Sequence, residues 1–131
     1  MRWQPKMISV DLNDMQTSLS KVQQCTKTLE EREAYVVRFI ADEILSNLKR
    51  HGDFSDKSAD ITLEIKRDDT LMMIFKDNSK KFNILEHNDP DILADIDDRA
   101  LGGLGIFLTK KYAKKIEYRY ENGYNILEIG L

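Results

Sequence analysis

The sequence has few of the residues that build disulfide bonds or thiolate metal sites. Cys25 is the only cysteine among 131 residues, and there are only two histidines. A single cysteine cannot form a disulfide within the chain, and a thiolate-rich zinc site needs more cysteine and histidine ligands than these. We therefore interpret Cys25 as a small buried side chain and not as a nucleophile.

Long apolar runs and an excess of positive charge are also missing. No apolar stretch approaches the roughly 20 residues that span a bilayer, and residues 1–5 lack the apolar core of a signal peptide. We therefore expect a cytoplasmic protein with no membrane attachment.

The net charge of −3 and the pI near 5.4 argue against direct nucleic-acid binding, because a surface that follows phosphates needs a basic excess.

The residues that are present suit one globular domain. The chain is 41% hydrophobic and 33% charged, which is ordinary for a folded domain of this length. We expect residues 1–131 to form a single domain.

The first part of the chain predicts a strand followed by two helices. Residues 6–12 have the character of a short strand, and the apolar spacing from Met15 to Val22 predicts a helix that begins near Asn13 or Asp14. A longer helix is expected between Thr28 and Arg50. The motif Thr28-x-x-Glu31 predicts a capping box at its start.

The longer helix carries two polar residues at the margin of its apolar face, which consists of Val37, Ile40, Ala41, Ile44, Leu45 and Leu48. Glu43 and Asn47 lie four residues apart, so they project from one side of the helix. Polar groups at a buried margin need partners. Two readings are open: neighbouring backbone satisfies both side chains, or Asn47 is a metal ligand beside a general base, Glu43, and both face a cavity.

Two hairpins are expected in the remainder of the chain. Residues 61–66 alternate between apolar and polar, and residues 71–75 follow after a polar turn, which predicts an antiparallel hairpin whose second strand ends at Asp77. A second hairpin with a tight turn at Asn122-Gly123 is expected to close the chain at residue 129.

Between the hairpins, residues 78–101 are polar and acidic and show no long periodic element. We predict a mobile lid over residues 80–100, with a short helical turn at Asp89-Pro90. A helix is expected over residues 105–115. The run Gly102-Gly103-Leu104-Gly105 at its start can bring backbone N–H groups close to a phosphate, although an ordinary glycine-rich turn explains this run equally well on its own.

The order of these motifs resembles the GHKL ATPase superfamily, which includes DNA gyrase and the catalytic domains of histidine kinases, and within it the anti-sigma-factor serine kinases. Glu43-x-x-x-Asn47-x-x-x-His51-Gly52 is similar to the N-box of the family. Asp77 is similar to the aspartate of its first glycine box, and Gly103-Leu104-Gly105-Ile106 to the second. The segment Phe82-Asn83-Ile84-Leu85 with Asp89-Pro90-Asp91 is similar to the anti-sigma branch.

The resemblance implies an α+β fold of the Bergerat type. This fold is a two-layer α/β sandwich in which three helices cover one face of a mixed, mainly antiparallel sheet of about five strands. ATP would lie between the helices and the lid.

The resemblance also implies roles for single residues. Asn47 would be the Mg²⁺ ligand, Glu43 the base that orients an attacking hydroxyl, and Asp77 the acceptor for the adenine amino group. The backbone of Gly102, Gly103, Leu104 and Gly105 would receive phosphate oxygens. Mg²⁺ prefers oxygen ligands and keeps several waters, so one amide oxygen together with phosphate oxygens is an adequate set.

One position departs from the family pattern. Where the first glycine box has Asp-x-Gly, this chain has Asp77-Asn78-Ser79. A positive φ at Ser79 would be strained, and the serine side chain could crowd the adenine. This departure predicts weakened nucleotide binding.

Two classes of function follow from the resemblance. In the first, the protein uses MgATP to phosphorylate a serine or threonine on a small anti-sigma antagonist, and intact Glu43 and Asn47 favour this class. In the second, it is a binding module that sequesters a sigma factor or a similar partner without catalysis, with or without nucleotide, and Ser79 favours this class. A histidine kinase is a poorer third choice. The sequence does not define the oligomeric state, and the resemblance leaves a homodimer open, since family members commonly dimerise.

Overall fold

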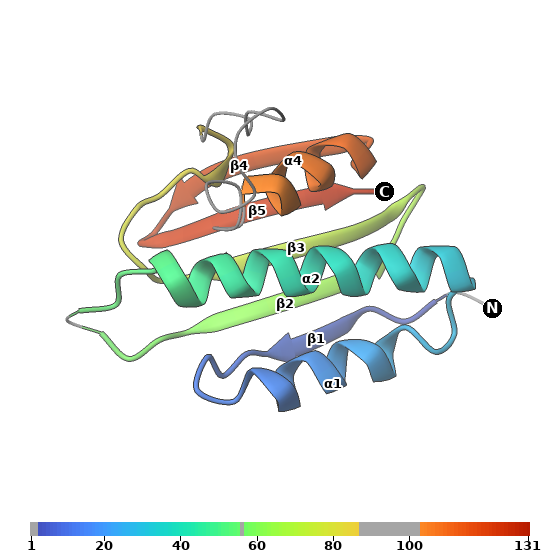
Figure 1. The fold of residues 1–131 in the computed structure, drawn as a ribbon, viewed down its shortest axis with the longest axis horizontal. Helices are drawn as coiled ribbons and strands as arrows, with labels where there is room; N and C mark the ends of the chain where they lie inside the picture. Colours follow the sequence, from blue (N-terminus) through green and yellow to red (C-terminus); the bar gives the residue numbers. More distant parts are fainter. Residues whose placement is uncertain (1–2, 56, 87–102) are drawn as a thin grey trace.

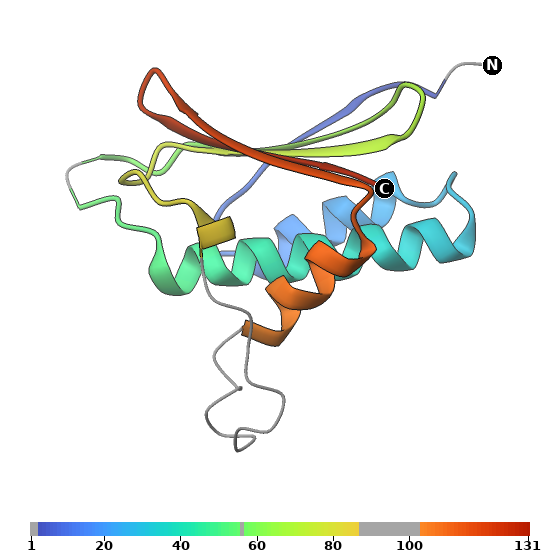
Figure 2. The same ribbon diagram turned by 90° about the horizontal axis from the view of Figure 1, so that it is seen from above.

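The computed structural model describes residues 3–55, 57–86 and 103–131. Within them, five strands form one sheet in the order β1-β2-β3-β5-β4. Helices α1, α2 and α4 all lie on the same face of this sheet, as Figure 2 shows from above. The expected two-layer α+β sandwich is confirmed. All four strand pairings are antiparallel, so the described sheet has no parallel component, where a mixed sheet was expected.

The N-terminal strand is shorter than predicted. Strand β1 covers Lys6–Ser9, because the chain turns at Asp11, whose backbone carbonyl accepts from the Asp14 N–H (3.0 Å) and whose side chain accepts from the Asn13 N–H (2.9 Å). Helix α1 then covers Met15–Cys25, and the Asp14 side chain caps it by accepting from the Thr17 N–H. The predicted start of this helix is confirmed.

The capping box predicted for the next helix is wrong. Helix α2 covers Glu31–His51, its N-cap is Glu30, and no side chain caps it. The Thr28 hydroxyl lies outside the helix and accepts from the Trp3 indole N–H at 2.8 Å. Glutamates in the first turn of α2 supply the negative charge that favours a helix N-terminus instead.

The apolar face of α2 packs against the sheet, as the sequence predicted. Ile40 and Leu45 are fully buried together with Leu63 and Ile65 of the sheet. Leu48 is only partly buried at the edge of this core. Cys25 is also partly buried, and burial raises the pKa of its thiol; a raised pKa keeps the thiol protonated, which agrees with its reading as a packing residue.

The predicted hairpins are confirmed. Strands β2 (Ile61–Arg67) and β3 (Leu71–Asp77) pair so that Ile61 lies opposite Asp77. Strands β4 (Lys115–Glu121) and β5 (Tyr124–Gly130) pair around the turn Asn122-Gly123. Both turn residues have positive φ, 53° and 83°, as the tight hairpin turn requires.

The bounds of the last helix differ from the prediction. Helix α4 covers Gly103–Tyr112 and not residues 105–115. The Lys114 N–H donates to the Gly130 carbonyl at 2.7 Å, and Lys115 already pairs with Gly130 in the sheet. Pairing with β5 therefore ends the helix at Tyr112, before the predicted end at residue 115. A short 3₁₀ helix, η1 (Ile84–Glu86), which was not predicted, follows β3.

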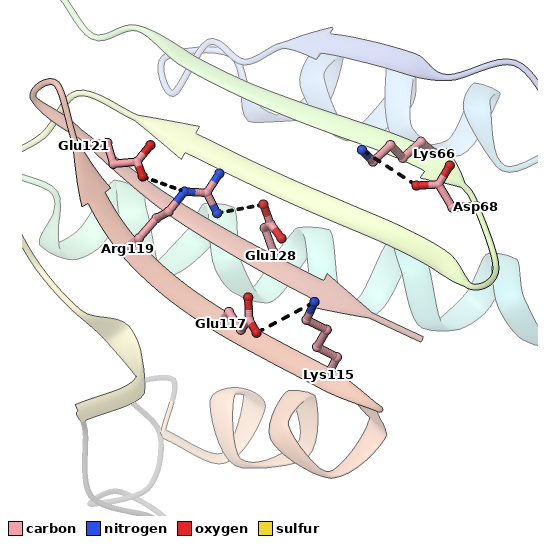
Figure 3. Close-up of polar contacts among 7 residues, drawn as sticks. All are labelled: Lys66, Asp68, Lys115, Glu117, Arg119, Glu121 and Glu128. Atoms are coloured by element: carbon pink, nitrogen blue, oxygen red, sulfur yellow. Dashed lines mark hydrogen bonds and ion pairs between the residues drawn. The ribbon is translucent and has the colours of Figure 1, made fainter.

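The face of the sheet away from the helices carries several ion pairs. Figure 3 shows Arg119 between Glu121 (3.4 Å) and Glu128 (2.7 Å), beside an ion pair of Lys115 with Glu117. Pairs as exposed as these contribute little to stability. Among the described residues, no helix has both the length and the apolar character needed to cross a bilayer.

Candidate functional site

A pocket lies between the C-terminal half of α2 and the ends of β2, β3 and β5. Its walls are mostly apolar, with a few polar groups, which is typical of a pocket for a small molecule. It is lined by Ile44, Asn47, Leu48, His51, Gly52, Ile61, Phe75, Lys76, Asp77, Ser79, Phe82, Ile84, Tyr118, Asn125 and Leu127. Two of the residues singled out in the sequence, Asn47 and Asp77, therefore meet at one cavity.

Asp77 lies at the end of β3 with only one of its carboxylate oxygens engaged. Its Oδ1 accepts from the Ser79 N–H (3.0 Å), the Ser79 hydroxyl (2.5 Å) and the Asn125 amide (3.1 Å). No donor within the described residues reaches Oδ2. One oxygen is thus held in place by the protein, and the other has no hydrogen-bond donor among the described residues.

The strain predicted at Ser79 does not occur. Among the described non-glycine residues only Asn122 has a positive φ, so the Ser79 backbone has no need of glycine. The Ser79 side chain is buried, only 2% exposed, because its hydroxyl turns back to donate to Asp77. The serine thereby becomes part of the wall of the cavity.

Asn47 also presents one unused oxygen. Its Nδ2 donates to the Glu43 carbonyl one turn earlier in α2 at 2.8 Å, so neighbouring backbone satisfies one of its two N–H donors. Its Oδ1 has no donor in the described part of the chain, although the residue is only 9% exposed. A buried amide oxygen without a partner suits a hard cation such as Mg²⁺, and Asn47 therefore fits the ligand that the family implies.

Glu43 does not line the cavity. Its carboxylate lies against Gly105 near the start of α4: a Cβ atom added to Gly105 would lie 1.8 Å from Glu43 Oε2. Burial raises the pKa of Glu43, the nearby Asp42 raises it further, and Arg50 opposes the shift. The reading in which Glu43 and Asn47 face the same cavity is therefore corrected, because Glu43 faces α4.

The glycine-rich run is described only in part. Gly103 and Leu104 begin α4, and Gly105 is buried in its first turn. Gly102 lies outside the described residues, as do residues 87–100 of the predicted lid, including Asp89-Pro90. His51, the last residue of α2, lines the cavity.

Sequence reasoning gave no site role to three lining residues, Tyr118, Asn125 and Phe82, although Phe82 belongs to the segment similar to the anti-sigma branch. Asn125 is buried, its amide reaches Asp77, and its side-chain oxygen accepts from the Phe82 N–H and the Tyr118 hydroxyl. A signal was present in the sequence, because an asparagine interrupts the apolar strand that ends the chain. Its meaning depends on the pairing of β5 with β3, which places Asn125 opposite Asp77.

The antiparallel sheet with three helices on one face is consistent with a Bergerat-type fold. The family model for the histidine kinase-like ATPase domain matches residues 8–131, and the chain belongs to this family. No curated protein sequence matches the chain.

Proposed function

We propose that the protein binds MgATP in this cavity and transfers the γ-phosphoryl group to a serine or threonine of a small partner protein. The observation that carries the proposal is the meeting of two unused oxygens, Asn47 Oδ1 and Asp77 Oδ2, at one cavity of a histidine kinase-like ATPase. The first suits a metal ion, and the second suits an amino group.

The nucleotide would be held at both ends. Asp77 Oδ2 accepts from the 6-amino group of adenine, which a 6-oxo purine lacks. Asn47 Oδ1 would hold Mg²⁺ together with phosphate oxygens and water, and the ion would neutralise charge on the phosphates. Backbone N–H groups at the start of α4, at Gly103 to Gly105, are suited to phosphate oxygens because a helix N-terminus favours anions.

Transfer of the γ-phosphoryl group needs a base near the attacking hydroxyl group. We assign this role to Glu43 because it belongs to the segment similar to the N-box and its carboxylate lies against Gly105, at the start of α4 where the phosphates are proposed to bind. Burial raises the pKa of Glu43, which suits a general base. The protein's other contribution is positioning, which dominates phosphoryl transfer.

For the partner, we propose a small anti-sigma antagonist as the phosphorylated protein and a sigma factor as the protein that is held when the antagonist is absent. Support comes from the resemblance of residues 82–85 to the anti-sigma branch. A cytoplasmic location and a homodimer belong to the same proposal.

A second candidate is a nucleotide-responsive module that sequesters its partner without catalysis. The position of Glu43 favours it, because the carboxylate faces Gly105 and not the cavity.

Calorimetry with MgATP tests the binding proposal. Asp77→Asn should weaken binding about tenfold, because amidation removes one carboxylate oxygen acceptor, worth about 1–3 kcal/mol. Asp69→Asn is the control, since Asp69 is exposed on the turn between β2 and β3, and it should leave the affinity within about twofold. Absence of heat with the wild type at millimolar ATP would refute the proposal.

The raised pKa of Glu43 predicts how the rate of phosphoryl transfer falls at acid pH. A protonated base cannot accept a proton, so transfer should rise with pH through the Glu43 pKa, above the ordinary value of 4.5. Asp42→Asn removes the second cause of the shift and should move this acid limb to lower pH. Rates of transfer between pH 4.5 and 8 measure both. An acid limb that stays in place in Asp42→Asn would contradict the assignment.

A further inference from the structure

The side chain of Asn125 makes several hydrogen bonds in addition to the backbone hydrogen bonds of β5. It is 6% exposed, and it lies in β5 directly opposite Asp77 of β3. Its Nδ2 lies 3.1 Å from Asp77 Oδ1, 3.1 Å from the Ser79 carbonyl and 3.3 Å from the Lys80 carbonyl. Its Oδ1 accepts from the Phe82 N–H (2.9 Å) and the Tyr118 hydroxyl (2.5 Å).

These partners fix which way the amide of Asn125 points. The Phe82 backbone N–H can only donate, so the atom that faces it must be the amide oxygen. The carbonyls of Ser79 and Lys80 can only accept, so the atom that faces them must be the amide nitrogen. Only one orientation satisfies both sides. In that orientation the two hydrogens of the nitrogen are shared among Asp77 Oδ1, the Ser79 hydroxyl oxygen and the two carbonyls, and Asp77 Oδ1 is among the nearest of these acceptors.

Tyr118 strengthens this arrangement from the neighbouring strand. It pairs with Leu127, two residues from Asn125 along β5, so both side chains lie on the same face of the sheet. Burial raises the pKa of the Tyr118 phenol, so at neutral pH the hydroxyl keeps its proton and continues to donate to Asn125. The chain of donors therefore runs from Tyr118 through Asn125 to Asp77.

The two oxygens of the Asp77 carboxylate therefore have different surroundings. The Asn125 amide and both donors of Ser79 all meet Asp77 at Oδ1, and no donor of the described residues meets it at Oδ2. A carboxylate held in this way cannot rotate without losing several hydrogen bonds, which is the kind of preorganisation that improves affinity and specificity.

We infer that Asn125 is a positioning residue that aims Asp77 Oδ2 at the ligand and so gives the cavity its preference for purines with a 6-amino group. The inference rests on the proposed binding of ATP. It adds a residue from β5, outside the N-box and the two glycine boxes, to the determinants of nucleotide specificity.

The test compares two ligands that differ only at C6. ATP carries an amino group there, and purine riboside triphosphate carries a hydrogen. Both are titrated with Mg²⁺ into the wild type and into Asn125→Asp, in which an oxygen replaces the donating nitrogen. We expect the wild type to prefer ATP about tenfold, and Asn125→Asp to lose about tenfold in ATP affinity while the purine analogue changes less than about twofold.

Asn78→Asp is the matched control. It adds the same negative charge one residue after Asp77, but Asn78 bonds to the Asp60 N–H and the Ser58 carbonyl and not to Asp77. It should keep the wild-type preference for ATP.

Tyr118→Phe provides a milder variant that keeps the aromatic wall of the cavity. Loss of its hydroxyl should lower the preference for ATP about threefold, in the same direction as Asn125→Asp. This variant decides the question if Asn125→Asp does not fold, which a thermal melt shows.

The outcomes separate the inference from the function on which it rests. A wild type that binds neither ligand overturns the proposed function and the inference with it. A wild type that prefers ATP, together with folded Asn125→Asp and Tyr118→Phe proteins that weaken both ligands equally or neither of them, overturns the inference alone.

Discussion

Replacing Glu43 by glutamine should lower phosphoryl transfer by about 100-fold or more, because a general base contributes about 10²–10⁴ to the rate and an amide cannot take a proton. The affinity for MgATP should change less than about twofold. Glu43 does not line the cavity, and glutamine keeps the shape that packs against Gly105. The substitution therefore separates chemistry from binding.

The assay uses γ-labelled ATP and a small antagonist protein, and it scores acid-stable phosphoserine or phosphothreonine. Glu31→Gln is the matched control, since Glu31 is exposed in the first turn of the same helix, and it should transfer normally. Asn47→Ala should differ from Glu43→Gln by weakening the Mg²⁺-dependent part of binding as well. Equal transfer by wild type and Glu43→Gln would refute the base assignment. Intact ATP binding with no transfer to any partner would favour the sequestering module.

The parts of the fold that the sequence predicted well are those set by local periodicity. The spacing from Val37 to Leu48 defines one helical face, and that face is buried against the sheet. The alternation in β2 and the Asn122-Gly123 turn predict hairpins, and the structure confirms that both form. In each case, the side chains that decide the conformation lie within a few residues of one another.

The predictions that failed depended on partners far along the chain. The helix at residue 103 ends early because β5 pairs with residue 115, and no signal within the helix marks that end. The Thr28 hydroxyl accepts from Trp3, 25 residues away, and not from its own helix. Local rules could not choose between these competing partners.

In the candidate site, too, the features set by local sequence were predicted and those set by distant partners were not. Asp77 was placed correctly at a strand end, and Asn47 at the margin of a buried face. The contact of Glu43 with Gly105 and the bonds from Asn125 to Asp77 join separate elements, so they appear only when α2, α4 and the sheet are assembled. The Ser79 departure was read as strain, because the hydrogen bond that turns its hydroxyl toward Asp77 was not visible in the sequence.

Gly105→Ala should reduce transfer about as much as Glu43→Gln does. A Cβ atom at this position would lie 1.8 Å from Glu43 Oε2 and 2.0 Å from its Cδ, so the carboxylate must leave its place. The three nearest atoms all belong to the end of the Glu43 side chain, which can rotate away. Alanine also favours a helix over glycine by about 1 kcal/mol. We therefore expect the free energy of unfolding, measured in urea, to change by less than about 1 kcal/mol.

The decisive measurement combines the two substitutions. If Gly105 acts by giving room to Glu43, then Gly105→Ala should add nothing to the transfer defect of Glu43→Gln, because both remove the same group. A residual rate that no longer depends on Glu43 should also lose the acid limb set by the Glu43 pKa, in Gly105→Ala as in Glu43→Gln. Lys111→Ala, exposed in the last turn of α4, should leave transfer within about twofold. Multiplicative losses in the double variant would show that Gly105 acts independently of Glu43, most simply through the backbone N–H groups that α4 offers to phosphate.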